Sequence, residues 1–178
     1  MKMFQQLWQV LIRIYLFVIT RAEKHYRADG TLEKIEHILR FSETAENKIV
    51  YGTKYFKPDG KTLDYVVILH PQEGTPKVMR HYHDNNKVAQ EEHYYRDGSH
   101  HLINNMSRNG TLIKQEVFSN PKQRKLGRST KAVIDFHSDG KRLKKVCSFH
   151  LDDNTVCKTQ FYEDDGKTVK ETIDHHLH

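Results

Sequence analysis

The sequence has few of the residues, and none of the motifs, from which common catalytic sites are built. Its 178 residues include only two cysteines, too few for a disulfide framework, and no G-x-S-x-G nucleophile motif. Neither cysteine has a histidine beside it in a helix-terminus context that would activate its thiol. The carboxylate pairs at 152–153 and 164–165 fall in expected turns, where Asp is common for conformational reasons. We therefore expect no catalytic residue, no cofactor and no enzyme activity.

Familiar metal-ligand spacings are also lacking, although the chain has 13 histidines. Zinc needs about four ligands that converge on one point, and no histidine pair here stands at such a spacing with cysteine or carboxylate partners. His81 and His83 share one face of an expected strand. Further histidines follow a turn or end the chain: His100, His101, His175, His176 and His178. The sequence predicts no metal site, but several histidines on one sheet would make binding sensitive to pH near neutrality.

Hydrophobic residues are scarce for a domain with a filled core. They make up 37% of the chain against 29% charged residues, and the mean hydropathy is -0.79. A rounded two-layer domain needs more apolar side chains to fill its interior. The 9 tyrosines, 8 phenylalanines and many Val and Ile residues nevertheless favour strands. The composition indicates an extended, thinly cored β protein.

Positive charge is in modest excess, with a net charge of +6 and a pI of about 9.2. A basic surface can attract nucleic acid, anionic lipid or acidic protein. Here the 23 Asp and Glu residues lie among the 29 Lys and Arg residues, and the densest basic run, residues 122–128, fits a solvated loop. The sequence therefore does not favour nucleic acid as a partner.

The first 21 residues differ from the rest of the chain. Apolar side chains recur there at helical spacing, which predicts an amphipathic helix over 1–21. Three roles remain open: a helix that caps the sheet or docks on a partner, membrane contact through residues 4–19, and a cleaved signal peptide. Arg13 interrupts a membrane span, and the residues around Thr20 make a poor cleavage site. The apolar residues are Phe4, Leu7, Trp8, Leu11, Tyr15 and Val18.

From residue 22 onward, turn signals recur roughly every 12 to 16 residues. Eleven signals imply about twelve strands, so we expect 22–178 to be an all-β, single-layer antiparallel meander of hairpin repeats. An Asp-Gly pair favours a type I′ turn, in which both central residues have φ > 0. The other breaks are Glu43–Asn47, Pro71–Gly74, Asn85-Asn86, Asn120–Gly127 and Asp153-Asn154. The turn-defining residues are Asp29, Gly30, Asp59, Gly60, Asp97, Gly98, Asn109, Gly110, Asp139, Gly140, Asp165 and Gly166.

The expected turns also imply cross-strand neighbours. His100 and His101 are expected opposite Tyr95 and Tyr94, and Leu143 is expected on the same face as Lys145, Cys147 and Phe149. Counting outward from Asp153-Asn154 places Cys147 opposite Gln160. The two cysteines then do not face each other, and free thiols fit a reducing cytoplasm.

Each repeat has an aromatic residue shortly before its Asp-Gly pair, as in YFKPDGKTLDYVVI and FYEDDGKTVKETI. These aromatics are expected to pack along one face as a stripe. A partly exposed stripe rimmed by charge would also bind a partner. The residues assigned to it are Tyr26, Tyr55, Phe56, Tyr82, Tyr94, Tyr95, Phe136, Phe161 and Tyr162.

With segments such as KAVIDFHSDGKRLKKVCSFHLDDNTVCKTQFYEDDGKTVKET, residues 22–173 resemble two bacterial groups. One is the extended β-sheet add-on domain of glycosyltransferases that modify adhesins and wall teichoic acids. The other is the MORN-variant group of Tyr-x-x-Asp-Gly hairpin repeats, which includes proposed antitoxin or immunity proteins. The first resemblance implies binding of a partner transferase subunit or acceptor polypeptide, or assembly into an oligomer. The chain lacks that family's Gly-rich phosphate-binding loop and its α/β lobe, so we expect a free-standing or truncated add-on module.

Together these observations predict a non-catalytic, cytoplasmic module that binds a protein or self-associates. One alternative is an antitoxin-like or immunity-like repeat protein that neutralises a partner by binding it. Another is a membrane-peripheral protein held by residues 4–19.

Overall fold

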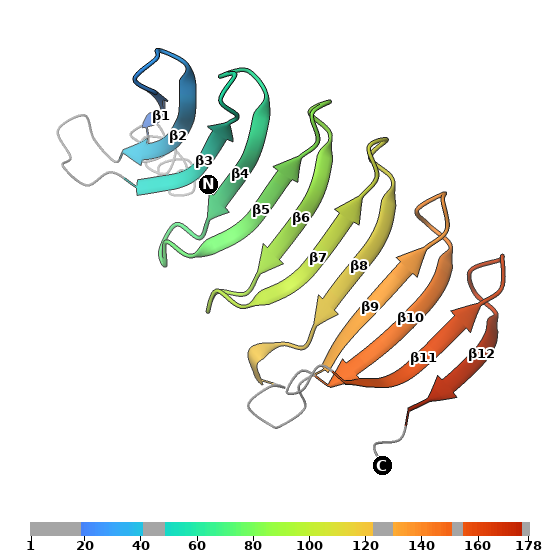
Figure 1. Ribbon diagram of the computed structural model, residues 1–178. Helices are drawn as coiled ribbons and strands as arrows, with labels where there is room; N and C mark the ends of the chain where they lie inside the picture. Colours follow the sequence, from blue (N-terminus) through green and yellow to red (C-terminus); the bar gives the residue numbers. More distant parts are fainter. Residues whose placement is uncertain (1–18, 41–48, 123–129, 151–154, 176–178) are drawn as a thin grey trace, which may run out of the picture.

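The computed structural model describes residues 19–40, 49–122, 130–150 and 155–175. They form one open sheet of 12 antiparallel strands that lie in chain order (Figure 1). The predicted all-β, single-layer hairpin meander is confirmed. The strands are β1 (Ile19–Tyr26), β2 (Leu32–Arg40), β3 (Ile49–Phe56), β4 (Leu63–Leu69), β5 (Pro76–Tyr82), β6 (Val88–Tyr94), β7 (His100–Met106), β8 (Leu112–Phe118), β9 (Thr130–Phe136), β10 (Leu143–His150), β11 (Val156–Tyr162) and β12 (Val169–Asp174).

Most of the predicted N-terminal helix lies outside the described residues. β1 already begins at Ile19, so the last three residues of the segment 1–21 belong to a strand, and the predicted boundary at residue 21 is wrong. β-branched residues at 19 and 20 favour that conformation, and Arg21 pairs with Ile38 of β2. The described residues contain no helix long and apolar enough to span a membrane.

The turns reverse the chain at the expected places but not with the expected geometry. The six glycines of the Asp-Gly and Asn-Gly pairs have φ between 64° and 84°, whereas Asn86 is the only non-glycine residue in the described ranges with positive φ. A type I′ turn needs positive φ at the preceding Asp as well, so that prediction is wrong. In the β6–β7 turn, Gly98 N–H donates to Tyr95 O at 3.0 Å and Tyr95 N–H donates to Ser99 O at 2.8 Å. This is the three-residue loop in which a left-handed glycine follows a type I turn.

The aspartates serve these turns as hydrogen-bond acceptors. Asp59 Oδ1 accepts the N–H groups of Lys61 and Thr62, both at 2.8 Å, and Asp165 makes the equivalent bonds in the β11–β12 turn. In each turn a threonine hydroxyl, that of Thr62 or Thr168, also donates to the carboxylate. These bonds and the bonds from the amides favour the ionised form. They hold the pKa of Asp59 and of Asp165 at about 2, below the ordinary 3.8.

Acid should therefore weaken the turns. Because the pKa of Asp59 and Asp165 is lower in the folded chain, their contribution to stability is present above about pH 4 and is lost as the pH falls towards 2. We expect the thermal midpoint to fall over that range. In the double variant Asp59→Asn, Asp165→Asn the amide oxygens still accept hydrogen bonds but do not titrate, so its midpoint should fall less. Equal falls in both proteins, measured by circular dichroism, would show that these carboxylates do not contribute.

A one-residue bulge interrupts the register of ten of the eleven strand pairs. Bulges increase the right-handed twist, which accounts for the curved ribbon in Figure 1. The observed register also corrects two predictions. Leu143 lies opposite Phe136 and so on the other face from Lys145. His100 pairs with Tyr94 rather than Tyr95, because the turn before it has three residues instead of two.

The two cysteines are free and not opposite each other, as predicted. Cys147 faces Thr159, one residue from the expected partner Gln160, and Cys157 is the bulged residue between Val156 and Lys158. The Cys157 thiol donates to Ser148 O at 3.2 Å.

The sheet has very little interior. Within the described ranges only two hydrophobic side chains are buried, Ile38 at 0% and Val78 at 8% exposure. Most other strand residues are half-buried by their neighbours on the same face. Cross-strand pairs therefore hold the fold together, rather than a core between layers.

Candidate binding surfaces

Register and alternation assign the side chains to two faces. Directly opposed residues share a face, and successive residues of a strand alternate. We call face 1 the face that carries Phe56 and Val66, and face 2 the face that carries Tyr55 and Val67. The turns lie along two opposite rims (Figure 1). Rim 1 carries the β1–β2, β3–β4, β5–β6, β7–β8, β9–β10 and β11–β12 turns, and rim 2 carries the β4–β5 and β6–β7 turns.

Face 1 carries a row of apolar side chains along rim 1, which we call the apolar row. Each odd-numbered strand ends there in an aromatic residue or methionine, and its cross-strand partner is Leu or Val. Tyr26 and Val169, at the two ends of the row, are 58% and 44% exposed, and the residues between them are half-buried. The pairs are Tyr26–Leu32, Phe56–Leu63, Tyr82–Val88, Met106–Leu112, Phe136–Leu143 and Tyr162–Val169.

Hydrogen bonds between successive hairpins hold the apolar row in place. The Arg27 guanidinium donates to Phe56 O at 2.6 Å and to Lys57 O at 3.2 Å. Further along the rim, Asn85 Nδ2 donates to Arg108 O at 2.8 Å. These bonds join side chains of one turn to backbone carbonyls of the next, so they fix the spacing of the row.

Face 2 instead carries partly buried glutamates that are paired with neighbouring groups. Tyr94 OH donates to Glu92 at 2.5 Å, and the carboxylate lies 2.9 Å from His100 Nε2 and 3.6 Å from His81 Nε2. Burial would raise the pKa of Glu92, but these hydrogen bonds and the nearby histidines outweigh it and hold the pKa below its ordinary value. Burial and the bond to Glu92 raise the pKa of the Tyr94 phenol.

Glu116 repeats this arrangement on β8. Lys131 Nζ lies 2.7 Å from the carboxylate and Lys114 Nζ lies 3.1 Å from it. The pKa of Glu116 is lowered because these bonds outweigh its burial. Since Lys131 is on β9 and His100 is on β7, the pairs with Glu116 and Glu92 join neighbouring strands and stabilise the register of the sheet.

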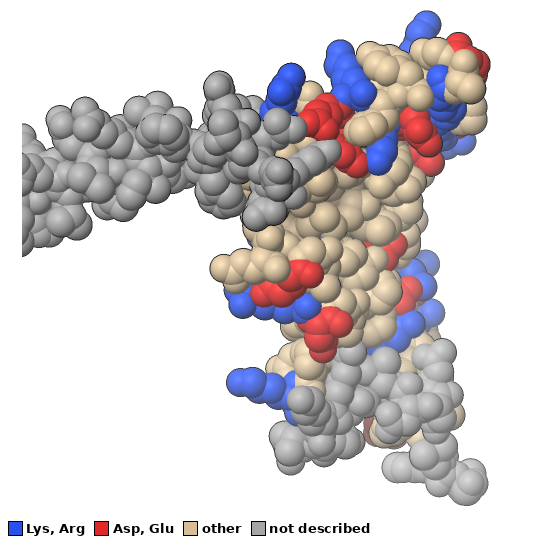
Figure 2. Space-filling model, turned by 90° about the vertical axis from the view of Figure 1, so that its left-hand side faces the viewer, with Lys and Arg blue, Asp and Glu red and all other residues tan. Residues whose placement is uncertain are grey.

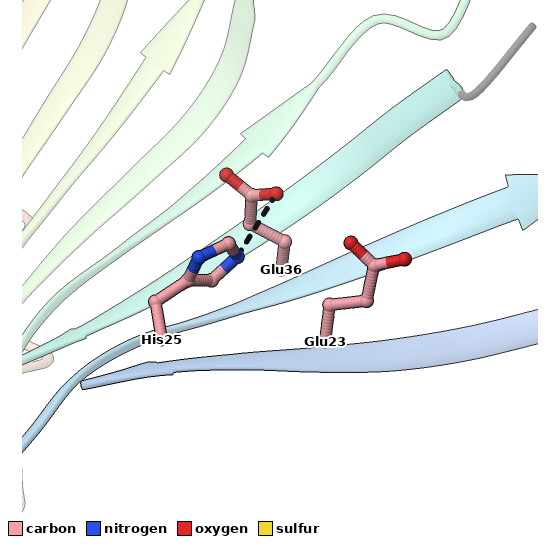
Figure 3. Close-up of side chains that lie close together, drawn as sticks. All are labelled: Glu23, His25 and Glu36. Carbon is pink, nitrogen blue, oxygen red and sulfur yellow. Dashed lines mark ion pairs between the residues drawn. The ribbon is translucent and has the colours of Figure 1, made fainter.

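Within the described ranges, one histidine–carboxylate group has donor atoms close enough to share a cation. Glu23, His25 and Glu36 each offer a donor atom, and these atoms lie within 4.8 Å of one another (Figure 3). His25 Nε2 is 3.3 Å from Glu36 but lacks hydrogen-bond geometry. Lys34 Nζ donates to Glu36 at 2.6 Å and so already neutralises one carboxylate. The group is a partial donor set for a divalent cation.

Sequence reasoning assigned no metal site and did not single out this group. Its signal was present in the spacing: Glu23 and His25 stand at i, i+2 and so share a strand face, and Glu36 follows the next turn. The register places Glu36 directly opposite Glu23.

The nine predicted aromatics do not form one stripe. Tyr55-Phe56, Tyr94-Tyr95 and Phe161-Tyr162 are neighbours in sequence, and neighbours on a strand point to opposite faces. Five belong to the apolar row of face 1: Tyr26, Phe56, Tyr82, Phe136 and Tyr162. Three lie on face 2: Tyr55, Tyr94 and Phe161. Tyr95 begins the β6–β7 turn at rim 2.

Tyr95 borders a shallow hollow of about 460 Å³ that Phe118 and Asn120, at the end of β8 and just beyond it, also line. Its ring packs against His101 with centroids 4.8 Å apart, and its hydroxyl donates to Phe118 O at 3.4 Å. Lys131 also lines the hollow but is engaged with Glu116. The hollow adds an aromatic contact area at rim 2.

Charge on the surface is mixed in sign. In Figure 2, Lys, Arg, Asp and Glu lie side by side at the top of the view, with an uncharged area below them. A nucleic-acid interface would require a one-sided basic stripe, and this view shows none over the described residues.

No protein-family model and no curated protein matches the sequence. Among solved structures, TarM of S. aureus, a teichoic-acid glycosyltransferase, is similar in a mutant form in complex with fondaparinux, α-GlcNAc-glycerol and UDP. That match has 14% identity and a TM-score of 0.40, and covers 64% of this chain and 22% of that one. A second TarM structure gives 15% identity and a TM-score of 0.39 with the same coverage. The structure of TcdB2-TccC3-TEV has 11% identity and a TM-score of 0.35, and the match covers 89% of this chain and 8% of that one.

The chain thus spans about a fifth of the TarM chains. At these identities and TM-scores the likeness is weak, and nothing about substrate or partner follows from it. The comparisons give the MORN-variant resemblance no support.

Proposed function

We propose that this chain is a non-catalytic module that binds a protein partner through the apolar row of face 1. The partner is a transferase subunit or acceptor polypeptide of a bacterial glycosylation system. One observation carries the proposal: six apolar pairs stand in line on an open sheet face, held at fixed spacing by bonds between turns.

The shape of the row favours an elongated partner segment. Strands lie about 4.8 Å apart, so a row across twelve strands is about 50 Å long. A helix that followed it would need about 35 residues at 1.5 Å per residue. Apolar patches rimmed by polar groups mark protein interfaces, and the turns of rim 1 supply charges of both signs beside the row, such as Asp59 and Arg142. The hairpin signature shared with the glycosyltransferase add-on sheet supports the class of partner.

Two matched variants test the row. Phe136→Ser removes an aromatic ring from face 1, and Phe161→Ser removes the same ring from face 2 two strands away. With each protein immobilised and exposed to extract of the native host, the captured protein is identified, purified and titrated. We expect Phe136→Ser to weaken binding at least about tenfold, as loss of an interface anchor does, and Phe161→Ser to bind like the unaltered chain.

The identity of the captured protein tests the class of partner. A nucleotide-sugar enzyme or its polypeptide substrate supports the proposal, whereas a lone toxic enzyme supports the antitoxin or immunity alternative. Equal binding by both variants, with equal thermal midpoints to show intact folds, rules out the apolar row as the interface.

A further inference from the structure

β12 forms one open edge of the described sheet. All six of its residues are exposed, and the strand order places no described strand on its outer side (Figure 1). Unpaired backbone groups on such an edge are a template for another strand.

The interior of the sheet shows which residues of β12 a further strand would pair with. Each earlier even-numbered strand from β4 to β10 offers its next neighbour a five-residue run that starts just after its bulge. These runs are Tyr65–Leu69, Gln90–Tyr94, Lys114–Phe118 and Lys145–Phe149. On β12 the bulged residue is Lys170, so the equivalent run is Glu171–His175.

The backbone of this run is set to pair outward at two positions. His175 N–H donates to Cys157 O at 2.9 Å, so the backbone groups of His175, Ile173 and Glu171 face β11. Alternation then directs the N–H and C=O groups of Thr172 and Asp174 to the open side.

The run is complementary to itself when two copies meet in antiparallel orientation about Ile173. Glu171 then faces His175 of the second copy, Thr172 faces Asp174, and Ile173 faces Ile173. The central isoleucine, 39% exposed in one chain, packs on its own copy, and Asp174 accepts from the Thr172 hydroxyl. We propose that Glu171–His175, the last four residues of β12 and the residue that follows it, is a homodimer interface in which two copies join edge to edge about a two-fold axis.

Other alignments are less favourable. A parallel, in-register pairing would place Glu171 against Glu171 and Asp174 against Asp174, and like charges directly opposite are destabilising. An antiparallel pairing centred on Thr172 would place Glu171 against Ile173 and use the bulged Lys170. The alignment about Ile173 is the one in which each side chain meets a compatible partner.

The interface is small, because two five-residue runs bury less than the roughly 1,200 Å² of a standard complex. The dimer should therefore be weak and depend on concentration. The run does not include Val169, the residue of the apolar row on β12, and the dimer is measured without a partner, so its failure and the failure of the proposed partner binding are separate results.

Sedimentation equilibrium from about 10 µM to about 1 mM tests the dimer. We expect the mass of the unaltered chain to rise from that of a monomer towards that of a dimer. Ile173→Lys would place like charges at the two-fold axis and should stay monomeric throughout. The matched control is Ile113→Lys, which makes the same change at an exposed position on β8 (45%) and should dimerise normally. An unaltered chain that stays monomeric, a dimer unaffected by Ile173→Lys, or growth beyond a dimer would each overturn the proposal.

Cross-linking tests the alignment. In a Cys147→Ser, Cys157→Ser background, Ile173→Cys should form a disulfide-linked dimer under mild oxidation, because opposed non-hydrogen-bonded residues have Cα atoms about 4.5 Å apart. Glu171→Cys should not, since four residues of offset separate its two copies by roughly 13 Å. Efficient cross-linking at 171, or none at 173, would contradict pairing about Ile173.

Discussion

Replacing Gly60 with alanine is expected to destabilise the sheet by about 3 kcal/mol through two separate penalties. Gly60 has a φ of +64°, a left-handed conformation that costs an L-residue about 1–2 kcal/mol. A Cβ atom there would also lie 2.8 Å from Leu32 N and 3.2 Å from Thr31 Cβ in the β1–β2 hairpin. One hairpin must shift to relieve that overlap, and overpacking of this kind costs about 1–3 kcal/mol.

Gly98→Ala separates the two penalties. Gly98 has a φ of +80°, but a Cβ atom there would meet nothing within 4 Å. Only the backbone penalty applies to Gly98→Ala, so its free energy of unfolding is expected to fall by about 1 kcal/mol. Urea unfolding of the two variants should therefore differ by about 2 kcal/mol, the contribution of packing between turns. Equal losses would show that the rim 1 turns do not constrain one another.

Ile38→Ala should cost about 3 kcal/mol, as expected when a fully buried isoleucine is truncated. Ile38 is 0% exposed, the most buried large side chain among the described residues. In so thin a sheet the lost contacts cannot be replaced from a second layer, so a cavity or a local collapse must follow.

Ile113→Ala is the matched control for Ile38→Ala. Ile113 lies within the sheet on β8 but is 45% exposed, so its truncation should change the free energy of unfolding by less than about 1 kcal/mol. Similar losses in the two variants, measured by urea unfolding, would mean that burial does not determine the stability of this sheet.

The number and place of the strands could be read from the sequence because the turn signals are local. Each glycine after Asp or Asn marks a reversal by its own backbone freedom, and the apolar residues between reversals favour strands. The type of turn could not be read from the same signal. An Asp before Gly suits a type I′ turn, but it also suits a carboxylate that accepts amide hydrogen bonds, as Asp59 does.

The candidate surfaces were harder to predict because they depend on register. Each bulge shifts the pairing by one residue, which moved Leu143 to face 1 beside Phe136. The Leu and Val residues of the apolar row could not be predicted for the same reason. Each of them stands next to a bulged residue, so alternation counted without the bulge does not give its face. Alternation alone would have shown that Tyr55 and Phe56 cannot share a stripe. The pairing of Glu92 and of Glu116 could not be predicted, because His100 and Lys131 lie on neighbouring strands and reach these carboxylates only in the observed register.

The strand order of Figure 1 also bears on how the molecule's length can vary. Each described strand is bonded only to the one before it and the one after it. Duplication of a hairpin in the gene would therefore add two strands to the sheet, and it would change only the strand–strand contacts at the point of insertion. Every such duplication would lengthen the sheet, measured across its strands, by about 10 Å. The number of hairpins therefore determines the length of the molecule, and evolution can change that length in fixed steps.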